Sequence, residues 1–229
     1  SIEELRDFLL ELHEERFDLH VHVIGDLATK RVLDAVELAK AAVGDDFYPR
    51  VSLGHLQTVD PGDWPRFREL GVSANFTPWW SGVDVPEPIG SGLGEARGND
   101  TFRSKAIADA GGNVTFSSDT WNLRYLSPFL GMQVGHTRQY PREWLTPEED
   151  PDDFLEPESE KKSIELLIRG YTLNGAYQLR MEDRIGSIET GKAADLVILK
   201  ENLFETDPYA IHQVKPDAVV MDGVLMHGT

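Results

Sequence analysis

The chain has 229 residues, 40% of them hydrophobic, which is enough to bury one full core with at most a small appendage. Its 22 basic and 40 acidic side chains give a formal net charge of -18, which repels phosphate backbones and argues against nucleic acid as a partner. Because the chain has no cysteine, disulfides and thiolate chemistry are excluded, and a metal ion would have to be held by His, Asp or Glu.

The sequence carries no sign of a membrane span or a secretion signal. It has no run of about 18 uninterrupted apolar residues, and it does not open with a basic segment followed by an apolar one. We therefore expect a cytoplasmic protein with no membrane partner.

The first 17 residues predict an amphipathic helix. Ser1 and Glu4 have the spacing of a capping box. Apolar residues recur at helical spacing, at Ile2, Leu5, Phe8, Leu9 and Leu12.

Strands and helices then alternate along the chain. “DLHVHVIGD” (18–26) predicts a strand, and residues 27–44 predict a helix that Asp26 caps and Gly44 ends. The next predicted elements are a strand at 50–57, a short helix at 60–71, a strand at 72–78, a helix at 101–112, a strand at 113–119 and a helix at 127–140. This alternation predicts βα units on a parallel sheet.

Two other parts of the chain do not follow this alternation. The segment “WWSGVDVPEPIGSGLGEARG” (79–98) has no periodicity and is typical of an active-site loop, although many such loops have no function. A last helix is predicted at 160–180. After it, glycine-punctuated β segments at 183–205 and 216–229 have no helix between them. We therefore expect one α/β domain at 1–180 and a small β appendage at 181–229.

Three residues form a candidate metal site. His22 lies near the end of the first predicted strand, His55 lies within “RVSLGHLQ”, and Asp119 ends “NVTFSSD”. Function in parallel βα architectures sits at the carboxyl ends of the strands, so these side chains are predicted to share one rim. Two imidazoles and a carboxylate suit a catalytic zinc-type ion, and the carboxylate can also move a proton.

Alternatives stay open at this point. A single histidine at a strand end is more often a satisfied polar residue than a ligand. His20 shares a strand face with His22, so it is either a second ligand or a wall residue one layer deeper. The remaining histidines are interpreted as surface or structural residues: His13, His136, His212 and His227.

Five segments together resemble the amidohydrolase superfamily. They are “HVIGDLATKRVLDA”, “GHLQTVDPGDWPRFRELGVSANFTP”, “FSSDTWNLRYLSPFLGMQVGHTR”, “YTLNGAYQ” and “IGSIETGKAADLVIL”. The similarity covers nearly the whole chain, and it is strongest to the branch that contains N-substituted formamide deformylases and exoenzyme-regulator-like proteins. The family has a (β/α)8 TIM barrel and a small β-sandwich.

The resemblance implies that the chain is the C-terminal half of such an enzyme. “DLHVH” imitates the His-x-His of the family's first barrel strand, but the stretch from His22 to Asp119 holds only about four βα units, whereas a whole barrel takes about 250 residues. The Gly-Asp after His22 instead resembles the family's strand five. The expected fold is therefore barrel strands five to eight plus C-terminal segments of the β-sandwich.

On this alignment His22 matches the strand-five ligand, His55 the strand-six ligand, and Asp119 the strand-eight ligand and general base. His20 matches no family ligand. The family's first-strand His-x-His pair and its strand-four bridging residue, commonly a carboxylated lysine, have no counterpart here. The resemblance thus implies a site for a divalent metal, most often zinc, with one or two ions in the complete enzyme.

The implied activity is metal-dependent hydrolysis of amide or formamide-type C–N bonds in a small molecule. The expected partners are the missing N-terminal half or a second copy of the chain, because half a barrel exposes strand edges and apolar surface. The alternative is a catalytically incomplete fragment that acts as a regulatory or binding module. Substrate-binding residues stay unknown; Arg103, Trp79 and Trp80 are weak candidates.

Overall fold

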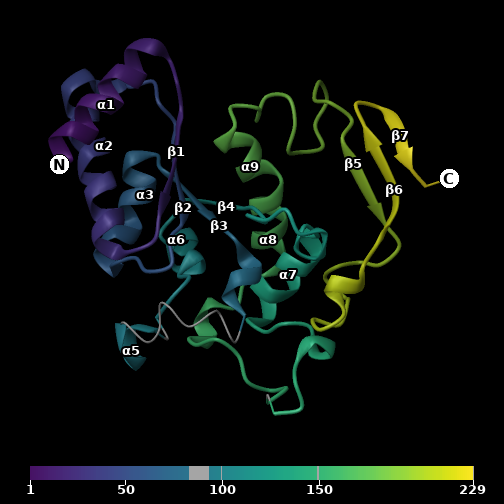
Figure 1. Ribbon diagram of the computed structural model, residues 1–229. Helices are drawn as coiled ribbons and strands as arrows, with labels where there is room; N and C mark the ends of the chain where they lie inside the picture. Colours follow the sequence, from purple (N-terminus) through teal and green to yellow (C-terminus); the bar gives the residue numbers. More distant parts are fainter. Residues whose placement is uncertain (83–92, 99, 149, 229) are drawn as a thin grey trace. The chain divides into compact units, whose positions relative to one another are not determined.

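A computed structural model describes residues 1–82, 93–98, 100–148 and 150–228 of the chain. The chain divides into two compact units (Figure 1). Unit 1 contains Ser1–Phe76 and Asp100–Val114, and unit 2 contains Thr77–Asn99 and Thr115–Thr229. These units are defined by their compactness. The domain boundary predicted at residue 180 is defined by the change from alternating strands and helices to strands alone, and it stays a prediction.

Unit 1 is built from helices and a parallel sheet, as the alternating pattern predicts. Its elements are α1 (Ile2–Glu15), β1 (Leu19–Val23), α2 (Asp26–Val43), η1 (Gly44–Asp46), β2 (Val51–His55), η2 (Pro61–Asp63), α3 (Trp64–Leu70), β3 (Ser73–Phe76), α6 (Ser104–Asp109) and the start of β4 (Asn113–Phe116). The strand order is β1-β2-β3-β4, and β1 pairs with β2, and β2 with β3, in parallel. The α/β class is thereby confirmed.

Burial explains why these segments form strands and helices. Every residue of β2 and β3 is buried, as parallel strands covered on both faces require. Helices α1, α2 and α3 lie along the same side of the strands (Figure 1). Their apolar faces form the core of unit 1 with the sheet, and its fully buried members include Leu9, Leu33, Val36, Leu53, Phe67 and Ile107.

The helix ends agree with the sequence in one case and differ in another. The capping box of Ser1 and Glu4 on α1 is present. Asp26, predicted to cap α2, is instead the first residue of that helix, and Gly25 occupies the capping position. The physical reason is that Thr58 Oγ1 accepts a hydrogen bond from the Asp26 N–H at 3.1 Å, so this N–H needs no cap from the chain before it.

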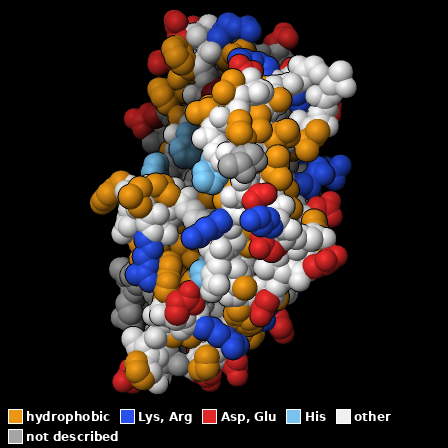
Figure 2. All heavy atoms as spheres, turned by 90° about the vertical axis from the view of Figure 1, so that its right-hand side faces the viewer, with side chains coloured by type: hydrophobic (Ala, Val, Ile, Leu, Met, Phe, Trp, Pro, Cys, Tyr) orange, Lys and Arg blue, Asp and Glu red, His pale blue; other side chains and the backbone are white. Residues whose placement is uncertain are grey.

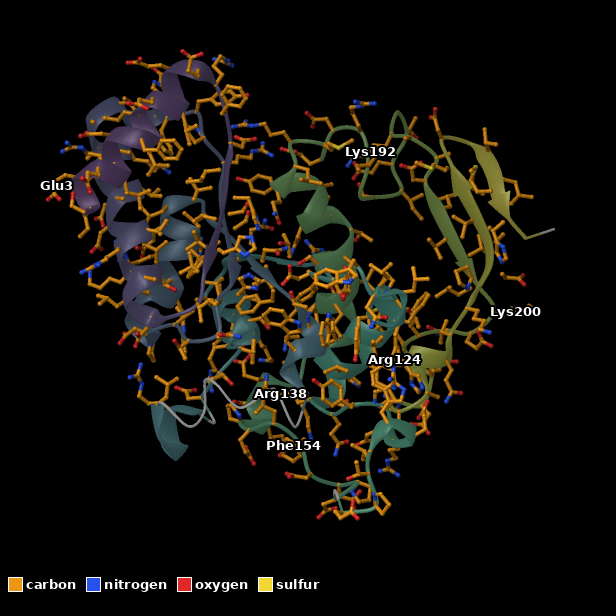
Figure 3. The ribbon with its side chains drawn as sticks, in the orientation of Figure 1. Glu3, Arg124, Arg138, Phe154, Lys192 and Lys200 are labelled. Carbon is orange, nitrogen blue, oxygen red and sulfur yellow. The ribbon has the colours of Figure 1, made fainter. Side chains whose placement is uncertain are left out.

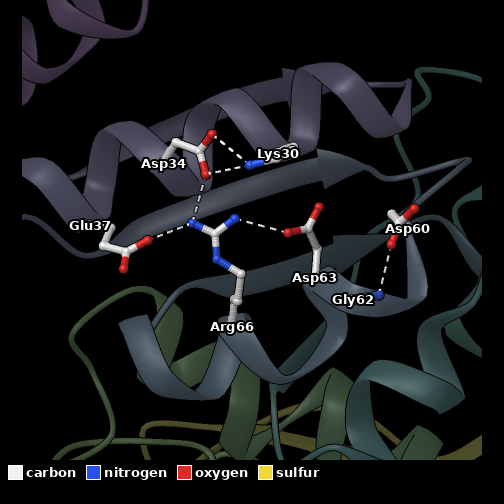
Figure 4. A network of polar contacts seen from close by, with 7 residues as sticks. All are labelled: Lys30, Asp34, Glu37, Asp60, Gly62, Asp63 and Arg66. Atoms are coloured by element: carbon white, nitrogen blue, oxygen red, sulfur yellow. Dashed lines mark hydrogen bonds and ion pairs between the residues drawn. The ribbon is translucent and has the colours of Figure 1, made fainter.

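A charged network ties α2 to the start of α3 (Figure 4). The guanidinium of Arg66 lies 2.9 Å from Asp34, 2.8 Å from Glu37 and 2.9 Å from Asp63, and Lys30 also contacts Asp34 at 2.8 Å. The Asp63 side chain is only 8% exposed. Since a buried carboxylate is costly unless it is paired, Arg66 is the residue on which this contact depends.

Unit 2 combines short helices with an antiparallel sheet. Its helical elements are η3 (Pro78–Ser81), α5 (Glu95–Gly98), η4 (Leu123–Tyr125), α7 (Pro128–Thr137), η5 (Arg142–Trp144), η6 (Glu158–Glu160), α8 (Ile164–Tyr171), α9 (Leu173–Gln178) and η7 (Ile211–Gln213). Its sheet contains β5 (Leu196–Leu199), β6 (Pro216–Met221) and β7 (Val224–His227) in the order β5-β6-β7. Both strand pairs are antiparallel.

Three predictions for this unit need correction. The single helix predicted at 160–180 is two helices, because Thr172 leaves the helical conformation and its hydroxyl donates to the carbonyl of Ile168 at 2.7 Å. The strand predicted at 113–119 ends at Phe116. The β segment at 183–205 forms a strand only over β5, and the one-turn helix η7 lies between the predicted β segments.

The loop predicted at 79–98 is described only in part. Residues 83–92 lie outside the described residues, and the rest contains η3 and α5.

The antiparallel sheet of unit 2 exposes apolar side chains. Figure 2 looks onto the side of the molecule where this sheet lies and shows hydrophobic side chains at the surface in its upper part. The exposed apolar residues of the sheet are Val197, Ile198, Met221, Val224, Leu225 and Met226.

Among the described residues, no helix has the length and apolar character needed to cross a membrane.

Replacing Arg66 with Ala should destabilise the protein by about 2–3 kcal/mol, because the buried carboxylate of Asp63 loses its partner. Urea unfolding would measure this loss. The matched control is Lys30→Ala, which removes a cation that is 55% exposed from the same network and should cost less than about 1 kcal/mol.

Acid should reduce the difference between wild type and Arg66→Ala. Burial alone would raise the pKa of Asp34, but hydrogen bonds from Lys30 and Arg66 outweigh it and hold that pKa below its ordinary value. A carboxyl group whose pKa is lower in the folded protein than in the unfolded chain stabilises the fold at pH values above its unfolded pKa of about 3.9. This stabilisation is lost as the pH falls through the pKa of the folded state. If Arg66→Ala and Lys30→Ala lost the same stability at neutral pH, the role of Arg66 would be contradicted.

Candidate functional site

Two of the three predicted site residues lie together in unit 1. Nδ1 of His22 lies 2.5 Å from Nε2 of His55, and the ring centroids are 4.6 Å apart at an interplanar angle of 51°. His22 is exposed on β1, whereas His55 is 9% exposed at the end of β2. The parallel sheet therefore brings together two residues that are separated by a whole βα unit in the sequence.

The backbone of His55 redirects its side chain. In the register of β1 and β2, His22 is opposite Gly54 and His55 is opposite Val23. Because side chains alternate along a strand, a regular strand would place the ring of His55 on the face of Val23, away from His22. His55 instead has a φ of 77°, and Leu56 follows with a φ of 50°. This left-handed backbone lets the two rings meet.

Such a conformation has an energetic cost that suits a functional position. Left-handed φ values cost a non-glycine residue of the order of 1–3 kcal/mol and cluster at active sites. Asp119, the third predicted site residue, also has a positive φ, 43°. Two of the three candidates thus have a positive φ, His55 at the end of β2 and Asp119 three residues after β4. Among the described residues the same holds for non-glycine residues outside the candidate site: Arg16, Leu56, Phe102, Arg138, Arg180 and Asp222.

The histidine pair brings two candidate nitrogen ligands together. At a separation of 2.5 Å only one hydrogen can lie between Nδ1 of His22 and Nε2 of His55, so at least one of them presents a lone pair. Neutral imidazole nitrogens are donors that zinc takes from histidine, and two of them on one tetrahedral ion, each about 2.0–2.1 Å from it, lie about 3.3 Å apart. The residue types therefore fit two ligands of such an ion, but the hydrogen-bonded rings would have to separate for both to bind it. Within the described ranges no group of three or more His, Cys, Asp or Glu is placed to hold a metal ion.

Asp119 belongs to unit 2. It is exposed and follows β4 by three residues. Ser118, its neighbour in the chain, accepts a hydrogen bond at its carbonyl from Nε1 of Trp79 at 2.7 Å. The role of Asp119 beside the histidine pair stays a prediction.

His20 packs against the sheet. A Cβ added to Gly54 would lie 3.1 Å from Nε2 of His20, so this ring lies over the glycine of the neighbouring strand. Its ring centroid is 5.9 Å from that of His22. These contacts place His20 beside Gly54 and His22, and its role as a second ligand or as a wall residue stays a prediction.

Three other histidines make structural contacts. Nδ1 of His13 accepts a hydrogen bond from the N–H of Tyr48 at 3.1 Å, and Nδ1 of His136 lies 2.6 Å from the carbonyl oxygen of Lys162. Nε2 of His212 lies 2.5 Å from Glu143. Burial alone would raise the pKa of Glu143, but hydrogen bonds from its own backbone and from His212 lower it below the ordinary value.

The weak substrate-binding candidates fall in different surroundings. Arg103 belongs to unit 1, where it pairs with Asp100 at 2.9 Å and stacks over the ring of Trp64 with its Cζ 5.2 Å from the centroid. These contacts hold the Arg103 side chain within unit 1, and its contact with a substrate stays a prediction. Trp79 and Trp80 belong to unit 2, and their rings meet edge to face at 5.9 Å.

Sequence reasoning missed an aromatic array in unit 2. The ring of Tyr125 stacks on Trp79 at 4.3 Å with an interplanar angle of 13°, and its edge meets Trp144 at 5.9 Å. The guanidinium of Arg124, labelled in Figure 3, lies over the ring of Trp144, with its Cζ 3.7 Å from the ring centroid. The members are far apart in the sequence, so only the density of aromatic residues on 79–80 and 121–144 could have indicated the array.

Comparison with known proteins identifies relatives over the whole chain. The model of a family described as “Amidohydrolase family” matches residues 1–227. The putative amidohydrolase YtcJ of Bacillus subtilis is 27% identical over 225 residues, covering 98% of this chain and 40% of its own length. N-substituted formamide deformylase of Arthrobacter pascens is 27% identical over 236 residues, covering 99% of this chain and 40% of its own length.

The fold is also found in solved structures. An adenosine deaminase from Xanthomonas campestris, solved with bound Zn, matches 100% of this chain and 49% of its own with a TM-score of 0.60 and 18% identity. At this identity the likeness concerns the fold alone. The chain spans about two fifths of the length of the curated relatives described above.

Replacing Gly54 with Ala should cost little stability, less than about 1 kcal/mol, because the ring it meets belongs to the exposed His20 and can move by a few tenths of an ångström. The NMR signals of the His20 ring should shift, while those of His22 and His55 should change less. The matched control is Gly112→Ala, whose new Cβ would lie 2.7 Å from Ile107 and 3.1 Å from Phe67 in the core. It should cost about 1–3 kcal/mol, and an equal loss at both positions would contradict the mobility of His20.

Proposed function

Because the chain belongs to the amidohydrolase family, we propose that it serves metal-dependent hydrolysis of amide or formamide-type C–N bonds in a small molecule. The observation that carries this proposal is the pair of imidazole nitrogens from His22 and His55 at 2.5 Å, held by a strained backbone at a strand end. The name of the relative from Arthrobacter pascens supports the choice of bond.

The proposed fold assignment is finer than the family itself. We propose that β1, β2, β3 and β4 are the counterparts of barrel strands five to eight, and that β5, β6 and β7 are the counterparts of C-terminal strands of the small sandwich. The parallel order of the first sheet and the match to about two fifths of each relative support this assignment.

In this proposal His22 and His55 hold a divalent metal ion, which we take to be zinc. The neighbour solved with bound Zn supports that choice. When bound, the ion supplies an acidified water and Lewis acidity toward a carbonyl oxygen. The sheet holds the two proposed ligands in place, because both lie on strands whose register is fixed by backbone hydrogen bonds.

Asp119 is proposed as a ligand and as the group that moves the proton. Its carboxylate takes a proton from the attacking water and returns it to the nitrogen of the leaving amine. The exposed position of Asp119 at a strand end suits this exchange of protons.

A second candidate function is a binding or regulatory module that does not turn over substrate. The observation that favours it is that, in the part of the chain that the structure describes, no three acidic or histidine side chains form a metal-binding group. This candidate predicts that the purified chain hydrolyses no amide even when it holds a metal ion.

Exposure of the purified chain to zinc, followed by removal of the excess, should leave about one ion per chain in plasma mass spectrometry. His55→Ala should lose most of this metal, because the site loses one of two imidazole ligands. His136→Ala is the control, since that ring bonds to the Lys162 carbonyl and should leave the metal content unchanged. An unchanged metal content in His55→Ala would reject the assigned ligands.

Replacing Asp119 with Asn should lower the rate of formate release from an N-substituted formamide by about 10²–10⁴-fold per bound ion, the scale of a lost acid–base catalyst. The assay uses the zinc-loaded chain. Turnover equal to that of wild type would contradict the proton role of Asp119. No hydrolysis by a wild-type chain that holds zinc would favour the binding module instead.

A further inference from the structure

Unit 2 contains a pocket that none of the candidate site residues lines. Its volume is about 400 Å³, and its lining includes His136, Lys161, Ser163 and Tyr209. These residues come from three places in the chain: the last turn of α7, the residues just before α8, and the segment just before η7. A pocket of this volume has room for a small molecule.

The lining of this pocket is basic. His136, Lys161 and Lys162 belong to it, and among the residues that the structure describes no Asp or Glu does. The chain as a whole carries a formal net charge of -18, so a basic lining is an exception in this protein. Because a pocket lined by one sign of charge attracts ligands of the opposite sign, the pocket favours an anion.

Lys161 supplies the charge that a ligand can reach. Its Nζ lies 3.1 Å from Oε1 of Glu158 and 3.8 Å from the ring centroid of Phe154, which is labelled in Figure 3. The Glu158 side chain is 72% exposed, and an exposed ion pair is weak. A ligand anion can therefore replace Glu158 beside Lys161. Lys162, in contrast, is buried and donates to the carbonyl of Glu160 at 3.2 Å.

Other lining groups add hydrogen-bond donors. Nδ1 of His136 lies 2.6 Å from the carbonyl oxygen of Lys162, and since a carbonyl only accepts, Nδ1 carries the hydrogen. This leaves Nε2 for a ligand, to which the imidazolium form donates. The Ser163 hydroxyl accepts from the N–H of Leu166 at 3.2 Å and can donate its own hydrogen. The Tyr209 hydroxyl is a further donor on the same lining.

This set of donors suits a phosphate group. A phosphate group has three terminal oxygens that accept strongly, so it can take several donors from different sides at once. Hydrogen bonds between such an oxygen and an ammonium group are the strong, charge-assisted kind. Pro208 and the ring of Tyr209 also line the pocket and offer apolar surface to an organic part of the ligand.

We propose that this pocket is a binding site for a phosphate group, carried by a small ester or present as the free ion, with Lys161, Ser163, Tyr209 and His136 as its donors. The site is separate from the proposed hydrolysis, because none of these residues is a candidate ligand or proton carrier there.

The test is an NMR titration of the chain, without added metal, with glycerol 3-phosphate, inorganic phosphate and acetate at equal ionic strength. Both phosphate probes should give saturable shifts of the Ser163 and Tyr209 amide signals, and acetate should bind about ten-fold or more weakly. Tighter binding of glycerol 3-phosphate would identify the ester as the ligand, and equal binding would identify the free ion. Either result supports the phosphate site.

Two variants change the binding in opposite directions. Lys161→Gln should weaken the binding of both phosphate probes about ten-fold or more, because a charge-assisted hydrogen bond is lost. Glu158→Gln should strengthen it about two- to five-fold, because Lys161 no longer has to leave an exposed ion pair. The matched controls are Lys200→Gln and Glu201→Gln, which make the same charge changes on another pocket of unit 2 and should leave the affinity unchanged.

The absence of saturable shifts with both phosphate probes would overturn the proposal. Acetate binding as tight as phosphate binding would do the same, as would equal affinities of wild type and Lys161→Gln. The gain expected for Glu158→Gln over Glu201→Gln keeps the proposal testable if Lys161→Gln does not fold, and its absence would contradict the role of Lys161.

Discussion

The parallel register of β1 and β2 is the constraint on which the candidate site depends. It sets the end of one strand beside the end of the next, so that His22 and His55 start from neighbouring positions. Register alone would leave their rings on opposite faces, and the left-handed backbone of His55 is what turns one ring toward the other. The parallel register brings the two residues close, and the left-handed backbone of His55 brings their rings into contact.

Much of the fold follows from the sequence because its signals are local. The capping box of Ser1 and Glu4 and the alternation of β-branched residues in β1 act within a few residues. The errors arise where a distant group intervenes. Thr58 bonds the N–H of Asp26 and so moves the start of α2. The break at Thr172 depends on a hydroxyl bond that helical periodicity does not reveal.

The sequence named candidate site residues but gave no indication of their geometry. The rule that function lies at the carboxyl ends of parallel strands points to His22, His55 and Asp119. The structure brings the first two together, whereas the role of Asp119 beside them stays a prediction. A positive φ at His55 could not be foreseen, because histidine gives no signal for it as glycine does. The aromatic array was equally hidden, since Trp79, Tyr125 and Trp144 meet only through tertiary folding.

The distribution of tryptophan has an optical consequence. Unit 1 contains one tryptophan, Trp64, whereas unit 2 contains the other four, among them the stacked Trp79. Stacked aromatic rings in fixed orientations give near-ultraviolet circular dichroism that is lost when tertiary packing is lost. That spectral region should therefore report mainly on unit 2, while far-ultraviolet dichroism follows the helices of both units. Comparing the two spectral regions during heating would show whether the units melt as one cooperative body or in succession.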